Sequence, residues 1–210
     1  MSVSNGPGII TSGLVLNLDI TDVNSYPGSG TSVYDLSGNN YTFTLQGNAV
    51  YSSEGKGSIY LDGSADGIQR LSTSGLLSSV TLVQWLKTSD TTGLMLSGQP
   101  VGSTGGYYVG AYYPGVGFYN QNCGSPTFYI DTSLTSNPAT PINYLDNKWH
   151  MWEAKGLNFA SWTDTWNFLG YAAGYEIAGY VGKIMMYNRS LTAAESLQNY
   201  NSLKSRFGIK

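Results

Sequence analysis

The chain has 210 residues, of which 27 are Gly, 17 are Tyr and only 11% are charged, and its formal net charge is −3. Ordinary soluble domains carry about 25% charged residues, so the few charges here favour strands and loops over exposed helices. The lack of a basic run argues against nucleic acid as a partner, and no apolar run reaches the ~20 residues of a membrane span. One domain with one sizeable core is the expectation.

The first residues of the chain are polar and contain Gly and Pro, which predicts a flexible N-terminal arm over residues 1–12 and a single folded domain over 13–210. The arm shows no basic segment followed by an apolar one, so we expect no signal peptide and synthesis in the cytoplasm. The only cysteine, Cys123, leaves no intrachain disulfide.

Strand signals follow one another from residue 14 onward. In "GLVLNLDI" the residues Leu14, Leu16, Leu18 and Ile20 alternate with polar ones, which indicates a half-buried strand. The same alternation occurs in "YTFTLQG", whereas "SVTLVQWLKT" is apolar on both faces and predicts a central strand. Further short strands are expected in "GLMLSG", "GYYVGAYY", "GVGFYN", "KWHMWEA", "WNFLGYAA" and "AGYVGKIMMYN". Turn signals about every 8–12 residues are typical of a sandwich or barrel.

One helix is expected, close to the C-terminus. Thr192 and Glu195 have the spacing of a capping box, and Gly208 suits the stop that follows the helix. Apolar residues then recur at helical spacing, so we expect the helix and the residues after it to lie on the sandwich and to bury Leu197, Tyr200 and Phe207.

The run "GKIMMYNRSLTAAESLQNYNSLKSRFG", residues 182–208, resembles the closing segment of laminin G-like, concanavalin A-like jelly-roll domains, in the form found in bacteriophage and cyanophage virion proteins. Four more stretches occur in the family's order: "GLVLNLDITDVNSYPGSGTSVYDLSGNN", "GSIYLDGSADGI", "VTLVQWLKT" and "DNKWHMWEA". The resemblance implies an all-β, two-sheet antiparallel sandwich with one short C-terminal helix. Arg189, in "YNR", is expected to pair with a carboxylate and anchor that helix.

Catalytic residues are not evident. Glycosidases of the resembling fold use a Glu-x-Asp-x-x-Glu strand, and two close carboxyls are what retaining hydrolysis requires. No Glu-x-Asp occurs in this chain, and Glu153 is alone on its expected strand. His150, the only histidine, has no "GxSxG" partner and is expected to pack or to hydrogen-bond a neighbouring loop. We therefore predict that the protein is not an enzyme.

A calcium ion is the one cofactor that the sequence leaves open. Calcium takes six to eight oxygen ligands, and relatives of the resembling fold hold it with Asp side chains. The candidates are Asp19 in "LDITD" and the pair Asp62 and Asp66 in "LDGSAD". Asp–Gly is equally an ordinary hairpin turn, so both interpretations stand.

Aromatic residues are the remaining candidates for binding. In "GGYYVGAYYPGVGFYN" strand alternation puts Tyr108 and Tyr112 on one face, and "SWTDTW" supplies Trp162 and Trp166. Exposed Tyr and Trp offer large rigid area for stacking on a sugar ring or anchoring a protein interface. The alternative interpretation is that most of these rings pack the two sheets together or line a contact between subunits.

Two functions are weighed on this basis. The resemblance favours a phage virion structural protein on the particle surface, in the first place a capsid decoration (cement) protein, made in the host cytoplasm and contacting the major capsid protein or tail proteins. The alternative is a tail-fibre or baseplate carbohydrate-binding module that attaches to host surface glycans. Homo-oligomerisation is left open.

Overall fold

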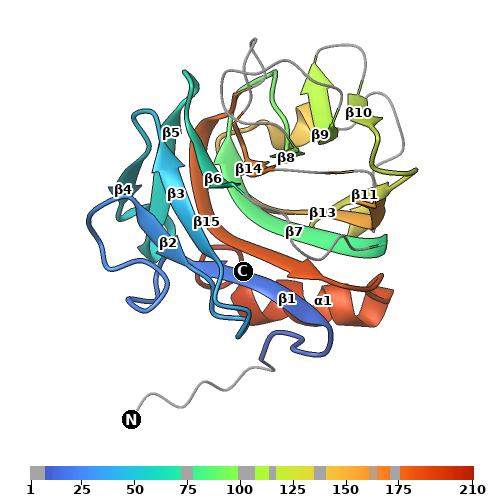
Figure 1. The fold of residues 1–210 in the computed structure, drawn as a ribbon. Helices are drawn as coiled ribbons and strands as arrows, with labels where there is room; N and C mark the ends of the chain where they lie inside the picture. Colours follow the sequence, from blue (N-terminus) through green and yellow to red (C-terminus); the bar gives the residue numbers. More distant parts are fainter. Residues whose placement is uncertain are drawn as a thin grey trace.

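The computed structural model describes residues 8–71, 78–98, 107–113, 117–134, 141–160, 162, 165–170 and 176–210, and only the backbone of residues 71, 111–113, 117, 141 and 142. Figure 1 shows two stacked β-sheets with one helix outside them. The predicted all-β sandwich with one C-terminal α-helix is therefore confirmed. Within the described residues no helix is long and apolar enough to cross a membrane.

The first sheet has eight strands, all paired antiparallel. Its order is β12 (Ser133–Leu134), β11 (Thr127–Ile130), β13 (Trp149–Asn158), β7 (Ser78–Thr88), β15 (Ala178–Tyr187), β5 (Ser58–Asp62) and β4 (Val50–Ser52). β1 (Leu14–Asp19) pairs with the second half of β15, on the same side as β5 pairs with the first half.

The second sheet has seven strands, also antiparallel. Its order is β10 (Gly117–Gln121), β9 (Tyr108–Tyr113), β8 (Leu96–Ser97), β14 (Thr165–Phe168), β6 (Gly67–Leu71), β3 (Thr42–Gln46) and β2 (Ser32–Tyr34). Two short 3₁₀ helices lie in connections, η1 (Glu54–Lys56) and η2 (Pro141–Tyr144).

The main core lies between the sheets and follows from strand alternation. On β1 the side chains of Leu16 and Leu18 point inward and are fully buried, as predicted. β7 is the predicted central strand, flanked by β13 and β15. Its Leu82 and Leu86 belong to the core between the sheets, whereas Trp85 belongs to a second apolar cluster on the outer face. A central strand that is apolar on both faces thus serves two cores.

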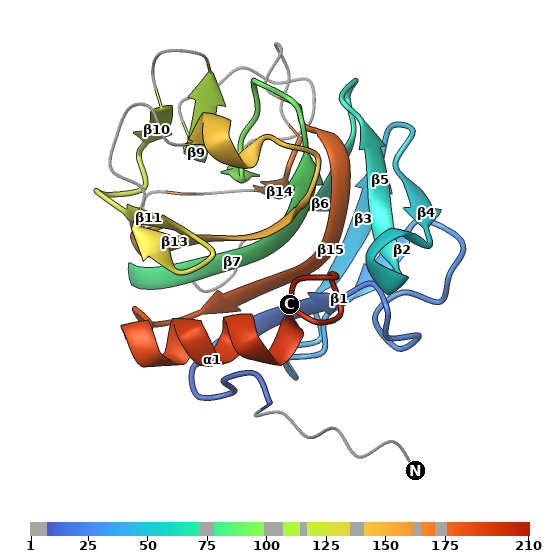
Figure 2. The same ribbon diagram turned by 180° about the vertical axis from the view of Figure 1, so that it is seen from behind.

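Helix α1 (Ala193–Leu203) covers this second cluster. Figure 2 shows the helix from behind, against the outer face of the first sheet. The predicted capping box is present: Glu195 N donates to Thr192 Oγ1, and Thr192 N donates to Glu195 Oε2. The predicted anchor is present as well, since Arg189 donates two hydrogen bonds of 2.8 and 2.7 Å to the Glu195 carboxylate. These bonds lower the pKa of Glu195 to about 2.

The buried face of α1 differs from the prediction. Leu197 is 48% exposed, and the fully covered positions are Ser196 and Asn199. Ser196 Oγ donates to Glu153 Oε1 on β13, and Asn199 Nδ2 donates to Tyr187 Oη on β15. Buried polar groups require hydrogen-bond partners, so these two bonds set the rotation of the helix and turn Leu197 outward.

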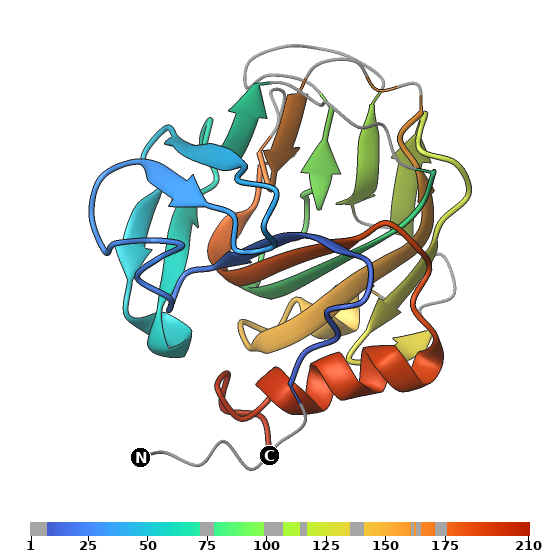
Figure 3. The ribbon, with the colours of Figure 1, turned by 60° about the horizontal axis from the view of Figure 1, so that its bottom comes forward.

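Of the two C-terminal aromatics that were predicted to be buried, Phe207 is buried and Tyr200 is partly buried. Phe207 stacks on Trp85 with ring centroids 4.5 Å apart, and Tyr200 stacks on the same indole at 5.7 Å. Full burial of such a ring contributes about 1.5–3 kcal/mol. Figure 3 shows α1 and the turn that follows it at the C-terminal end of the chain.

Residues 8–12, which were predicted to belong to a flexible arm, are docked on α1. Ile10 N donates to Asn199 Oδ1 at 2.8 Å, Tyr187 Oη donates to Ile10 O, and Gln198 Nε2 donates to Gly8 O. Figure 3 shows this blue segment running down from the sheet to the helix. The folded domain therefore includes residues 8–12, and residues 1–7 lie outside the described part of the chain.

A buried ion cluster ties the C-terminal turn to the first sheet. Asp19 Oδ2 contacts Lys183 Nζ of the neighbouring strand, and Asp19 Oδ1 accepts a hydrogen bond of 2.7 Å from Arg206 Nη1. Arg206 also donates to the carbonyl of Gly182 at 2.9 Å. Asp19 is thus the counter-charge of two cations that the fold has largely removed from water.

Candidate functional site

A row of polar side chains crosses the whole second sheet, with one residue on each strand. Every member is directly paired with the next across the strands. We call this the polar row, and in order from β2 to β10 it consists of Ser32, Thr44, Gln69, Asn167, Ser97, Tyr108 and Gln121.

Strand alternation explains why the polar row faces away from the core. The neighbours of its members along the strands, such as Phe43, Ile68 and Phe168, lie in the core, and the rings of Phe43 and Phe168 are 5.6 Å apart. Residues that flank them must point to the opposite face. The space for Asn167 is provided by Gly67, because a Cβ at that glycine would collide with Asn167 Oδ1.

The amides at the centre of the polar row have atoms without a hydrogen-bond partner among the described residues. Asn167 is 0% exposed, and among the described residues neither its Oδ1 nor its Nδ2 has a partner. Gln69, also buried, has no partner for its Nε2 in the same part of the chain. An unmade hydrogen bond of a buried polar group costs about 1–3 kcal/mol. Amide atoms that have no partner within the described part of the chain fit a ligand that is rich in hydroxyl groups.

One end of the polar row combines an amide with aromatic rings. Tyr108 Oη donates a hydrogen bond of 2.6 Å to Gln121 Oε1, and the ring of Tyr108 lies 5.5 Å from that of Tyr119, which is exposed. An accessible tyrosine ring offers a stacking surface beside polar groups.

The two predicted binding tyrosines stand differently in β9. Tyr108 is a member of the polar row, as described above. A register shift in the β9–β10 pair and the positive φ of Gly110, 63°, interrupt the alternation that put Tyr112 on the same face. Tyr112 pairs with Phe118, and its side chain lies outside the described residues.

Both predicted binding tryptophans are buried in the core. Trp162 donates from Nε1 to Asn122 O at 2.6 Å, and Trp166 packs edge-on against Tyr41 with centroids 6.3 Å apart. With 1% and 2% of their surface exposed, these rings pack between the sheets and cannot stack on a ligand from solvent. The alternative interpretation of these aromatics, that they fill the core, is the one the geometry supports.

The three candidate calcium ligands are engaged elsewhere. Asp19 pairs with two cations, as described above. Asp66 is buried and accepts hydrogen bonds from the backbone N–H groups of Asn48 and Asp62, and burial raises its pKa. The side chain of Asn48 donates to Asp62 and lowers the pKa of that carboxyl. In the described part of the chain no three His, Cys, Asp or Glu side chains come together in a group that could hold a metal, and calcium binding stays a prediction.

Glu153 and His150, which were weighed as catalytic residues on the sequence alone, have structural roles. Burial raises the pKa of Glu153, which lies beneath α1 and accepts the hydrogen bond of Ser196. His150 hydrogen-bonds Asp131 through Nδ1 and Asp146 through Nε2, so the predicted bond to a neighbouring loop is confirmed.

The polar row itself was missed from the sequence. Its central members stand in "WNFL" and "LMLSG", each as one polar residue next to an apolar one, and in "GIQRL", where Gln69 lies between Ile68 and Arg70. That local signal marks an outward-facing position, but only the strand order brings Gln69, Asn167 and Ser97 side by side.

Comparisons with known proteins identify the fold. No protein-family model and no curated protein sequence matches the chain. Among solved structures, domain 4 of AbnA, a GH43 extracellular arabinanase from Geobacillus stearothermophilus, in complex with arabinotriose, has a TM-score of 0.58 at 12% identity, covering 90% of this chain and 98% of that one. The chain is a jelly-roll β-sandwich.

Two other solved structures share this sandwich. The botulinum neurotoxin serotype D binding domain has a TM-score of 0.55 at 12% identity, covering 91% of this chain and 52% of that one. Trypanosoma rangeli sialidase has a TM-score of 0.53 at 14% identity, covering 92% and 33%. The chain thus spans about half of the toxin domain and a third of the sialidase, and at these identities the likeness shows the fold alone.

Proposed function

We propose that this chain is a non-catalytic carbohydrate-binding β-sandwich that holds a glycan along the polar row. The observation that carries the proposal is the row itself: seven polar residues on seven adjacent strands, with the Tyr108–Gln121 pair beside the exposed ring of Tyr119 at one end. At its centre, Asn167 Oδ1 and Nδ2 and Gln69 Nε2 have no hydrogen-bond partner among the described residues. Hydroxyl groups of a sugar both donate and accept, so they can satisfy an amide's oxygen and nitrogen together.

Saccharide complexes of structural neighbours support this choice. Domain 4 of AbnA is in complex with arabinotriose, and the binding domain of botulinum neurotoxin DC, at 12% identity, is in complex with SialylT. These are properties of those proteins, and no residue is transferred from them. They make a sugar the first ligand to test on this fold.

Binding without cleavage follows from the carboxylates. The polar row contains no Asp or Glu, and Glu153 serves α1 on the other sheet. Glycoside hydrolysis requires a pair of carboxyl groups on either side of the bond to be broken. We therefore propose that the polar row binds a glycan and does not cleave it.

The proposal also includes where this domain is located. The resemblance of residues 182–208 to virion proteins supports a place on the surface of a bacteriophage particle, as a capsid decoration protein or as a tail protein that attaches to host glycans. Quantitative mass spectrometry of purified particles tests it. Hundreds of copies per particle indicate decoration, a few copies indicate the tail, and absence from the particle contradicts both.

A glycan array followed by titration calorimetry tests the carbohydrate proposal. We expect the wild-type chain to bind at least one glycan, with arabinotriose as the first probe, and Gln69→Leu and Asn167→Leu to weaken that binding about tenfold or more. Gln84→Leu is the matched control, because Gln84 is a buried amide that faces the core and donates to Met95 O. Absence of any bound glycan, or equal losses in all three variants, contradicts the proposal.

A further inference from the structure

A second cross-strand row lies on the opposite side of the molecule, on the outer face of the first sheet. Its members are directly paired from strand to strand across β4, β5, β15, β7 and β13. We call it the aromatic shelf, and in that order it consists of Val50, Tyr60, Tyr180, Lys87 and Trp149.

The shelf is open at one end and covered at the other. Val50 and Tyr60 are exposed, Tyr60 by 37%, while Trp149 is buried against Phe207. The rings of Tyr60 and Tyr180 are 5.1 Å apart and tilted by 47°. Two neighbouring tyrosines therefore present ring area at a surface that α1 leaves uncovered.

Polar groups border these rings. Lys87 Nζ lies 5.4 Å from the centre of the Tyr180 ring and forms an ion pair of 3.1 Å with Glu54 Oε1. Trp149 Nε1 donates to the same Glu54 oxygen at 3.2 Å. Hydrogen bonds from Lys87 and Trp149 hold the pKa of Glu54 below its usual value. The shelf thus carries a partly exposed donor and acceptor whose charges compensate each other.

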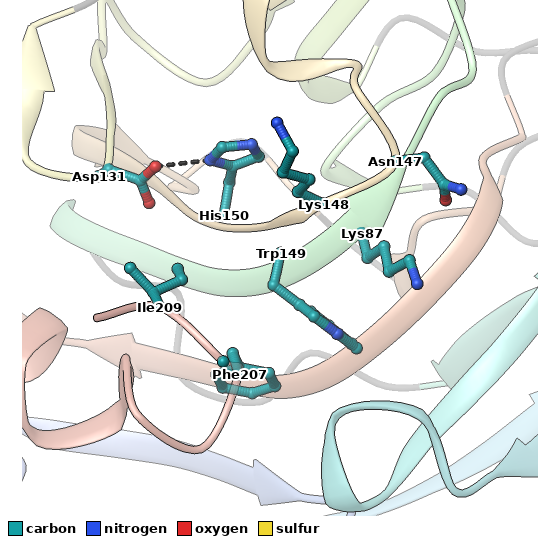
Figure 4. Close-up of a pocket in the computed structure, with 9 residues that line it drawn as sticks. Lys87, Asp131, Asn147, Lys148, Trp149, His150, Phe207 and Ile209 are labelled. Atoms are coloured by element: carbon teal, nitrogen blue, oxygen red, sulfur yellow. Dashed lines mark hydrogen bonds and ion pairs between the residues drawn. The ribbon is translucent and has the colours of Figure 1, made fainter.

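From Lys87 the shelf opens into a hollow of about 490 Å³. Figure 4 shows Trp149 and Phe207 side by side in it, with Lys87 and Asn147 on one side and the hydrogen-bonded pair of His150 and Asp131 on the other. A small-ligand site occupies roughly 300–1,000 Å³ and combines apolar walls with a few polar groups. The hollow has this size and this composition.

We propose that the aromatic shelf and its hollow form a second glycan site, in which one sugar ring stacks on Tyr60 and Tyr180 and the next unit of the chain enters the hollow. The apolar C–H face of a sugar ring matches an exposed tyrosine ring, and its hydroxyls match Glu54, Lys87 and Asn147. The compensated charges select a neutral saccharide.

A protein partner fits this surface less well. A stable protein interface buries about 800 Å² on each partner around a hydrophobic centre. The exposed apolar residues here belong to a single cross-strand row, flanked by the Glu54–Lys87 ion pair and by the polar side of the hollow.

The second site goes beyond the function proposed for the polar row. The two rows lie on the outer faces of the two sheets, so one domain would hold two glycan segments at once. Linking two weak sites in this way raises the overall avidity without any new contact.

Affinity electrophoresis in gels that contain soluble arabinan, xylan, mannan or β-glucan tests the shelf. The measurements use the Gln69→Leu background, in which binding by the polar row is weakened about tenfold or more. We expect retardation by at least one polysaccharide, and a loss of about tenfold in association when Tyr60→Ala and Tyr180→Ala are combined. Tyr60→Phe with Tyr180→Phe should bind like the parent, because it keeps both rings.

Tyr34→Ala is the matched control, since Tyr34 is 43% exposed but lies on the second sheet. Thermal unfolding confirms that each variant is folded. The proposal is overturned if no polysaccharide retards the Gln69→Leu parent, or if the double alanine variant binds as well as the parent. Because the wild-type chain still carries the polar row, failure in the Gln69→Leu background alone leaves the first site standing.

Discussion

Asp19→Asn is expected to be among the most damaging single substitutions outside the apolar core. The side chains of Lys183 and Asp19 are 4% and 16% exposed, and that of Arg206 is 13% exposed. Asparagine keeps the shape of the side chain but removes the one carboxylate among the described residues that contacts both cations. A buried ion pair that loses one partner costs about 3–5 kcal/mol, because the remaining charge is left without compensation.

The pKa of Asp19 gives a second measure of the same effect. Burial alone would raise this pKa, but Lys183 and Arg206 lower it from 3.8 to about 2. Because the folded value lies below the unfolded one, the stabilisation is fully present above about pH 4 and is lost as the pH falls through about 2. A shift of nearly two units corresponds to about 2.5 kcal/mol. The cost of a broken buried ion pair and the pKa shift of Asp19 thus both indicate that Asp19→Asn lowers the free energy of unfolding by about 3 kcal/mol. For a chain of this length that corresponds to about 10 °C in Tm.

Urea unfolding of the wild-type and variant proteins at neutral pH measures this loss. Lys148→Met is the control, because the Lys148–Asp146 pair is exposed and its removal should cost less than about 1 kcal/mol. When Asp19→Asn is combined with Lys183→Met, the loss in free energy of unfolding should be smaller than for Asp19→Asn alone, because one of the two uncompensated charges is gone. A cost for Asp19→Asn no larger than that of the control would refute the reasoning.

Four other substitutions test the helix and the loop around the hollow. Thr192→Ala removes the N-cap of α1 and should lower the free energy of unfolding by about 1 kcal/mol in a denaturant titration; no change would show that the cap is dispensable. Asn199→Leu should cost about 1–3 kcal/mol, whereas Leu197→Ser should be within about 0.5 kcal/mol of wild type, and the reverse order would contradict the observed rotation of the helix. For His150, burial alone would lower the pKa, but the carboxylates of Asp131 and Asp146 raise it above 6.5. Its stabilisation is therefore complete below pH 6.5 and lost as the pH rises through the folded value, and His150→Gln should flatten this pH dependence of unfolding.

The parts of the fold that could be predicted from the sequence depend on short-range patterns. Alternation in residues 14–20 and apolar residues on both faces of β7 report directly on local burial. The capping box and the Arg189–Glu195 pair join residues a few positions apart, so their spacing in the sequence is close to their spacing in the structure.

The parts that could not be predicted depend on long-range contacts. The rotation of α1 is set by Glu153 and Tyr187, which lie on strands remote in sequence. Whether Trp166 faces the core or solvent depends on which sheet covers it. The polar row and the aromatic shelf arise from strand order, and no local signal specifies that Asn167 lies between Gln69 and Ser97.

The side-chain amide signals in heteronuclear NMR spectra give the most direct test of glycan recognition by the polar row. On titration with the tightest ligand from the glycan array, the amide signals of Gln69 and Asn167 should shift and saturate at a common dissociation constant, while the signal of Gln84 in the core stays in place. Shifts confined to other residues, with the signals of Gln69 and Asn167 unmoved at saturation, would contradict the assignment of this face to sugar binding.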